Sequence, residues 1–129
     1  MSLLARITYP LFRRGLFRLH SGDMSTWKID CDVMGDDEVI TVAMMLREML
    51  PSFGDVEGIP MGGLRLARAL RQWTTPGNRT LLIVDDVLTT GVSMEEHRRG
   101  REAIGAVIFA RGPYPAWVTP LFSWGGIPR

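Results

Sequence analysis

An acidic pair followed by a hydroxyl-rich turn is the part of this 129-residue sequence best suited to bind a ligand. Asp85 and Asp86 come directly after the apolar run 81–84. Two carboxylates at the end of a buried strand are costly unless they face solvent, a cation or hydroxyl groups. The turn that follows supplies hydroxyls, a flexible backbone and the start of a predicted helix, and it consists of Thr89, Thr90, Gly91, Val92 and Ser93. Such a turn predicts an anion site.

A ligand with a diol beside a phosphate, such as ribose 5-phosphate, would satisfy both the acidic pair and the turn. In isolation, Asp85 and Asp86 are better explained as the plain end of a strand, with Ser93 as a helix cap. The combination of strand, acidic pair and hydroxyl-rich turn favours a binding site instead.

A second segment of unusual composition is the turn formed by Pro60, Met61, Gly62 and Gly63, which follows the short predicted strand 55–59. Ligands of open α/β sheets bind outside the carboxyl ends of the strands. The sequence therefore predicts one cleft shared by the ends of strands 55–59, 81–84 and 106–110.

The elements that must position these residues follow from hydrophobic periodicity. Residues 36–50 and 64–70 have helical spacing, a third helix is predicted over about 93–103, and a last strand over 117–124. The order strand, helix, strand predicts a parallel sheet flanked by helices. An N-terminal helix to about Arg18 and a hairpin over 17–20 and 27–31 would form a small hood. We thus expect one α/β domain over 1–129, with the hood in about 1–35 and the core in about 36–129.

Composition excludes several classes of protein. The net charge of +1 argues against a nucleic-acid binder. Arginines interrupt the apolar start of the chain, so we expect no secretory or membrane segment. A single cysteine, Cys31, suits the reducing cytoplasm, and it reads as a buried apolar residue. Lys28 is the only lysine, predicted to be exposed, and His97 is expected on a solvated helix face.

Residues 82–93 resemble the 5-phosphoribosyl 1-pyrophosphate signature of the type I phosphoribosyltransferases. The resemblance extends toward the orotate phosphoribosyltransferases. Residues 17–22 are similar to their N-terminal pattern, 58–63 to their pyrophosphate loop, and 107–111 to the strand that ends in their substrate-binding arginine. Together these matches span most of the chain from Phe17 to Arg111.

This resemblance implies a role for each matching residue. Asp85 and Asp86 would hold the ribose hydroxyls, and the turn 89–93 would surround the 5-phosphate. Arg111 would pair with a carboxylate or carbonyl of a pyrimidine base. Pyrophosphate would face Met61, Gly62 and Gly63, with Mg²⁺ bridging pyrophosphate and ribose oxygens. The resemblance and the surplus of tryptophan and methionine also predict a homodimer.

Val92 stands where the signature that this chain resembles frequently has a glycine. The chain departs further from the family pattern at two other places. His20, a candidate ligand contact, occupies the position of a common lysine. Only residues 72–80 separate the second helix from the signature strand, where the family has a further strand and a mobile basic loop. Such loops neutralise the leaving pyrophosphate and exclude water.

The leading hypothesis is therefore transfer of ribose 5-phosphate from 5-phosphoribosyl 1-pyrophosphate to an orotate-like base. A catalytically reduced module that binds or senses the donor or a nucleotide is the alternative. A phosphoryl-accepting receiver domain is disfavoured, because its acidic pair belongs on the first strand and no lysine follows Asp86 here.

Overall fold

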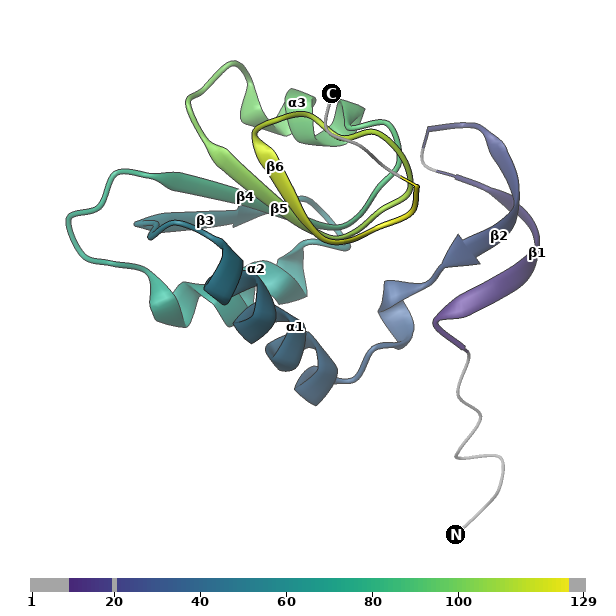
Figure 1. The fold of residues 1–129 in the computed structure, drawn as a ribbon, viewed down its shortest axis with the longest axis horizontal. Helices are drawn as coiled ribbons and strands as arrows, with labels where there is room; N and C mark the ends of the chain where they lie inside the picture. Colours follow the sequence, from purple (N-terminus) through teal and green to yellow (C-terminus); the bar gives the residue numbers. More distant parts are fainter. Residues whose placement is uncertain (1–9, 20, 126–129) are drawn as a thin grey trace, which may run out of the picture.

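The computed structural model describes residues 10–19 and 21–125, which form a parallel sheet with helices on both faces and a separate hairpin (Figure 1). The sheet has the order β3-β4-β5-β6. Its strands are β3 (Asp55–Gly58), β4 (Leu81–Leu88), β5 (Ile104–Ala110) and β6 (Val118–Ser123), and every neighbouring pair is parallel. Helices α1 (Asp36–Met49) and α2 (Leu64–Leu70) cover one face, and α3 (Val92–Arg98) lies on the other (Figure 1). The predicted α/β class is confirmed.

The strand β4 is buried on both faces, as its continuous apolar run predicts. Leu82 and Val84 belong to the cluster beneath α1 and α2. Ile83 points the other way and packs with Met94 of α3. All four side chains are at most 1% exposed. Because successive side chains of a strand alternate between faces, this one segment anchors both layers of helices.

Helix α1 begins where the sequence places acidic residues against the positive end of the helix. The backbone N–H of Gly35 donates to Glu38 Oε1 at 3.0 Å, which fixes the first turn. Val39, Val42, Ala43 and Leu46 form its buried stripe. The helix ends before Pro51, which cannot continue it.

Two predicted boundaries are wrong. The strand β4 continues four residues past Val84, so that Asp85 and Asp86 lie within it. Helix α3 ends at Arg98 rather than near Ala103, because Arg99 and Gly100 adopt left-handed backbone angles, with φ of 56° and 72°.

The N-terminal segment also differs from its prediction. A helix to about Arg18 was expected, but residues 12–18 form strand β1 (Phe12–Arg18), which pairs antiparallel with β2 (Met24–Ile29). Cross-strand contacts override local helical spacing here: Arg13 Nη1 donates to Asp30 Oδ2 at 2.9 Å, and Lys28 lies over the Phe17 ring. The part of that expected helix which carries Leu4 and Ile7 lies outside the described residues.

The short link between α2 and β4 leaves β3 at the edge of the sheet. Side chains satisfy both backbone groups of Val56 in this strand. Its N–H donates to Asp55 Oδ1 at 2.8 Å, and its carbonyl accepts from Arg71 Nη2 at 3.3 Å. The chain then turns through η3 (Arg71–Trp73) and returns directly to β4. None of the helices within residues 10–19 and 21–125 has the length and hydrophobicity of a membrane span.

Candidate functional site

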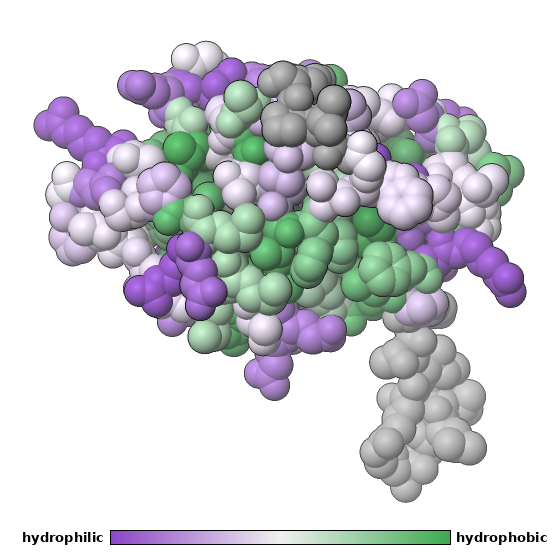
Figure 2. Space-filling view, viewed as in Figure 1, coloured by the Kyte–Doolittle hydropathy of each residue, from purple (hydrophilic) through white to green (hydrophobic). Residues whose placement is uncertain are grey.

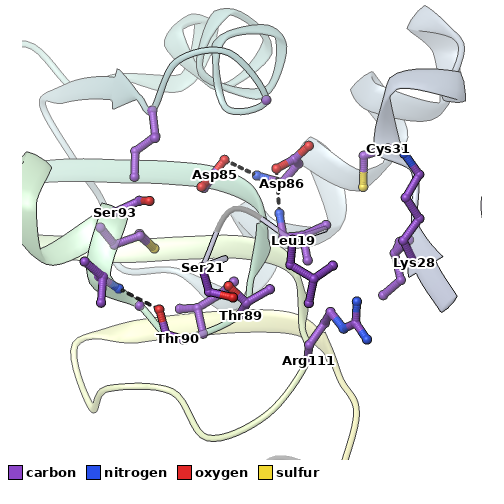
Figure 3. A pocket seen from close by; sticks show the side chains of 18 of the residues that line it. Leu19, Ser21, Lys28, Cys31, Asp85, Asp86, Thr89, Thr90, Ser93 and Arg111 are labelled. Atoms are coloured by element: carbon purple, nitrogen blue, oxygen red, sulfur yellow. Dashed lines mark hydrogen bonds between the residues drawn. The ribbon is translucent and has the colours of Figure 1, made fainter. Parts of the chain in front are cut away.

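A cavity of about 780 Å³ lies where the strand ends, the start of α3 and the hairpin meet. Its walls include the ends of β3 and β4, Arg111 after β5, and residues 28–32, where the hairpin ends and the chain continues toward α1 (Figure 3). The predicted convergence of the three strand ends on one cleft is therefore found. The hairpin forms the opposite wall, as the expected hood requires.

The acidic pair lies on the cavity wall with its carboxylates fixed by neighbouring backbone. Asp85 Oδ1 accepts the N–H of Asp86 at 2.8 Å, and Asp86 Oδ1 accepts the N–H of Val87 at 2.7 Å. Burial, and then the charge of Asp86 beside it, raises the pKa of Asp85 to about 8. Near neutral pH the Asp85 carboxyl therefore favours its protonated form.

The turn after β3 packs directly against this acidic pair. A Cβ atom on Gly62 would lie 2.4 Å from Asp86 Oδ2, so any larger residue at this position would displace the Asp86 carboxylate. Met61 and Gly62 line the cavity, and the Met61 side chain is 79% exposed. Gly63, the third predicted pyrophosphate contact, is buried behind them: its N–H donates to the Ile59 carbonyl at 2.8 Å.

The hydroxyl-rich turn occupies the neighbouring part of the wall. Thr89, Thr90, Gly91, Val92 and Ser93 all line the cavity. Gly91 has a φ of 87°, a left-handed angle that favours glycine. Val92, where the family often has a second glycine, begins α3 with an ordinary negative φ, so valine fits there without backbone strain. Its N–H faces Thr90 Oγ1 at 3.4 Å.

Arg111 lines the cavity, but its guanidinium is occupied by the hairpin. Nη1 donates to the Trp27 carbonyl at 3.2 Å and Nη2 to Ser25 Oγ at 3.0 Å. The guanidinium carbon also lies 3.4 Å from the centre of the Trp27 ring, whose other neighbour is Trp124. Burial lowers the pKa of Arg111. This arginine therefore ties the hairpin to the sheet.

The structure agrees with the sequence-based expectation for Cys31 but differs from it for Lys28. Lys28 was predicted to be a surface residue, yet it lines the cavity. Cys31 is 7% exposed, as expected, and also reaches the wall, where burial raises its pKa to about 12. His20 lies outside the described residues.

His97 takes part in a contact that sequence reasoning missed. Its Nε2 lies 2.8 Å from Glu57 Oε1, and Arg101 donates to both oxygens of the same carboxylate at 2.9 and 3.0 Å. The hydrogen bonds from Arg101 lower the pKa of Glu57 to about 2. The three side chains join β3 to the end of α3 away from the cavity wall. No sequence motif predicts this cluster, because Glu57 lies 40 residues from His97 and 44 from Arg101 along the chain.

The cavity wall carries more acidic than basic side chains. The basic residues on it are Arg18, Lys28 and Arg111, and the acidic ones are Asp23, Asp30, Asp32, Asp85, Asp86 and Glu96. Within residues 10–19 and 21–125, no three histidine, cysteine, aspartate or glutamate side chains are grouped to hold a metal ion. Two carboxylates, those of Asp85 and Asp86, fit a hard cation if the cation takes its other ligands from a bound substrate and from water.

Comparison with known proteins yields structural matches only. No protein-family model matches the chain, and no curated protein matches by sequence. Orotate phosphoribosyltransferase from Aeropyrum pernix is 22% identical, with a TM-score of 0.64 over 88% of each chain. The enzyme of the same name from Mycobacterium tuberculosis, in complex with inorganic phosphate, is 16% identical, with a TM-score of 0.58 over 86% of this chain and 87% of that one.

A third match is the UMP synthase of Leishmania donovani, which is 23% identical with a TM-score of 0.58. The alignment covers 78% of this chain and 28% of that longer one. Similarity at this identity concerns the path of the backbone: four parallel strands, three flanking helices and an N-terminal hairpin. The chain has the type I phosphoribosyltransferase fold, in the shortened form that its short link between α2 and β4 predicts.

Proposed function

We propose that this protein is a phosphoribosyltransferase that moves ribose 5-phosphate from 5-phosphoribosyl 1-pyrophosphate to an orotate-like pyrimidine base and releases pyrophosphate. One observation carries the proposal. The acidic pair, the hydroxyl-rich turn 89–93 and the glycine turn at Met61 and Gly62 all line one cavity. These are the segments that resemble the family's ribose, phosphate and pyrophosphate sites.

Each segment has a distinct task in this proposal. Asp85 and Asp86 accept hydrogen bonds from the ribose hydroxyls and favour the positive charge that develops on the ribose as pyrophosphate leaves. The backbone and hydroxyls of residues 89–93 hold the 5-phosphate. The turn at Met61 and Gly62 faces the pyrophosphate. Mg²⁺ supplies positive charge to the pyrophosphate when bound, and Asp85 and Asp86 are the side chains that would hold it, through water or directly.

The test measures release of pyrophosphate with donor, Mg²⁺ and a panel of orotate, uracil and purine bases. We expect release that depends on orotate. Binding of the donor without base-dependent release would instead identify a binding or sensing module. Donor binding should also weaken at least tenfold in Gly91→Ala, since alanine is strained at a φ of 87° and the phosphate turn must shift.

Gly77→Ala provides the matched control for this variant. Gly77 has a similar φ of 80°, and nothing lies within 4 Å of an added Cβ. It belongs to the link before β4 and does not line the cavity. Equal weakening in both variants would show that backbone strain, and not the phosphate turn, causes the loss, and would count against the assigned site.

We also infer a homodimer, formed through the outer face of α1. Four apolar side chains of this helix are exposed to solvent, namely Ile40, Met44, Met45 and Met49, with exposed fractions of 43, 53, 38 and 50%. Figure 2 shows apolar side chains gathered over the part of the surface where Figure 1 places α1. Several exposed apolar side chains on one helix are typical of an interaction surface.

Light scattering should give twice the 14.5 kDa mass of one chain at micromolar concentration. Met44→Glu should convert the protein to the single-chain mass, because a carboxylate cannot be buried unpaired in an apolar interface. Met24→Glu is the control, since Met24 is similarly exposed, at 51%, but lies in the hairpin. A single-chain mass for the unaltered protein would refute the dimer.

A further inference from the structure

The basic side chains on the cavity wall differ in how far their donors are already used. Arg18 donates to the Gly22 carbonyl at 3.2 Å within its own turn. Arg111 donates to Ser25 and Trp27, and its guanidinium covers the Trp27 ring. Neither arginine presents its full fork of donors to a ligand in this arrangement.

Lys28 is placed differently. Its Nζ lies 3.9 Å from Asp30 Oδ2, beyond hydrogen-bond distance, and that oxygen already accepts a hydrogen bond from Arg13 at 2.9 Å. Its other close neighbour is the Phe17 ring, at 5.1 Å from the ring centre. The side chain is 32% exposed. The ammonium group of this cavity-lining residue thus makes a long ion pair with Asp30 but no hydrogen bond within residues 10–19 and 21–125, which leaves its donors available to an anionic ligand.

The position of Lys28 in the cavity suggests which part of a ligand it meets. The ribose and phosphate belong at β4 and the turn 89–93, and the pyrophosphate belongs beside Gly62, which packs on Asp86. The base then extends toward the hairpin. Arg111 contacts the carbonyl of the peptide that joins Trp27 to Lys28, so the end of β5 meets the backbone of β2 next to Lys28. Figure 3 shows Lys28 beside Cys31 and Arg111 on the hairpin side of the cavity.

We propose, resting on the function proposed above, that Lys28 determines specificity by binding an anionic substituent, such as a carboxylate, on the acceptor base. Arg111 is then a positioning residue, which holds β2 so that Lys28 faces the ligand. A flexible ammonium group suits a carboxylate whose exact position varies among ligands. The chain's only lysine, otherwise without a role, acquires one.

Two nucleotides that differ only by a carboxylate test this assignment: orotidine 5′-monophosphate and uridine 5′-monophosphate. Both carry the ribose and phosphate that the rest of the site would hold. Calorimetric titration of the unaltered protein should show tighter binding of the orotidine nucleotide. Lys28→Met should remove about tenfold of that preference, the typical effect of losing one charge-assisted hydrogen bond, and leave the uridine nucleotide unaffected.

Two further variants make the result specific. Lys28→Arg should retain most of the preference, because it keeps the charge on a side chain of similar length. Arg14→Met removes a positive charge from β1 of the same hairpin, is exposed and does not line the cavity, and so should behave as the unaltered protein. A preference lost equally in Arg14→Met would show a general charge effect and overturn the proposal.

The remaining outcomes separate this inference from the proposed function. Equal binding of both nucleotides by the unaltered protein would refute the role of Lys28 while leaving the phosphoribosyl site intact. Unchanged preference in Lys28→Met would do the same. Weaker binding of inorganic pyrophosphate alone in that variant would reassign Lys28 to the leaving group. Binding of neither nucleotide, nor of the donor, would refute both proposals.

Discussion

Replacing Asp85 and Asp86 together by asparagine is expected to weaken binding of 5-phosphoribosyl 1-pyrophosphate more than a hundredfold. It is also expected to raise the melting temperature at pH 8. The loss of binding follows because the pair that accepts from the ribose hydroxyls loses its negative charge, and a hydrogen bond to a charged group is worth about 1.5–3 kcal/mol; the fit to a cation disappears as well. Inorganic phosphate, held by the turn 89–93, should still bind. Calorimetric titration of donor and phosphate measures both effects.

The gain in stability follows from the raised pKa of Asp85. This pKa is about 8 in the folded protein against 3.8 for the ordinary side chain, so between these values the folded state binds more protons than the unfolded state. The free energy of unfolding therefore falls as the pH rises from about 4 to 8. Asparagine does not titrate, so the double variant does not lose stability through ionisation of a buried carboxyl. Its free energy of unfolding at pH 8 should be higher than that of the unaltered protein by at least about 1 kcal/mol.

Thermal melts at pH 6 and pH 8 test the sign of this effect. The unaltered protein should have a lower melting temperature at pH 8 than at pH 6, and the double variant should show a smaller difference between the two melting temperatures. Glu102→Gln is the control, because Glu102 is exposed and does not line the cavity. Donor affinity within a factor of three of the unaltered protein would remove the acidic pair from the site.

Gly63→Ala is expected to lower the free energy of unfolding by about 3 kcal/mol or more. An added Cβ would lie 2.3 Å from the Val84 carbonyl oxygen and 2.6 Å from the Ile59 nitrogen. Both are backbone atoms held in the sheet, where the N–H of Ile59 donates to the Val84 carbonyl at 2.9 Å. Relief therefore requires the turn after β3 to separate from β4, which costs more than ordinary overpacking of side chains.

Denaturant unfolding measures this loss, with Gly112→Ala as the matched control. Nothing lies within 4 Å of a Cβ added to Gly112, and no positive φ constrains that residue. The control should unfold within about 0.5 kcal/mol of the unaltered protein. A loss below 1 kcal/mol for Gly63→Ala would show that the turn and β4 are less closely packed than the structure indicates.

The sequence predicts those elements whose signals are local and strong. The apolar, partly β-branched run before Asp85 favours a strand covered on both faces, and the acidic first turn and apolar stripe of α1 favour a helix there. The convergence of the acidic pair with Met61 and Gly62 follows in turn, since parallel strands end at the same edge of the sheet.

The errors arise where contacts distant in sequence decide the outcome. Residues 12–18 have helical spacing, but pairing with β2 gives them an extended backbone. Lys28 alternates with Trp27 in an edge hairpin, and sequence cannot say which of the two faces meets the sheet. Here Trp27 packs on Arg111 and Lys28 is left to the cavity. Spacing alone could not place Glu57 with His97 and Arg101 either, because their meeting depends on how α3 lies over β3.

The side chains of Asp55 and Arg71 cover the backbone of Val56 at the edge of β3, and this limits both the addition of a strand to the sheet and the pairing of the sheet with another molecule. A new strand could come from an insertion after α2 or from another molecule. To pair with Val56, it would first have to displace the side chains of Asp55 and Arg71 from the backbone of Val56. Side chains thus protect this edge from fibril-like growth, a hazard of open edges. A longer basic loop grafted between Trp73 and Leu81 should accordingly be tolerated as a surface excursion, but it will not restore a fifth strand while Arg71 remains.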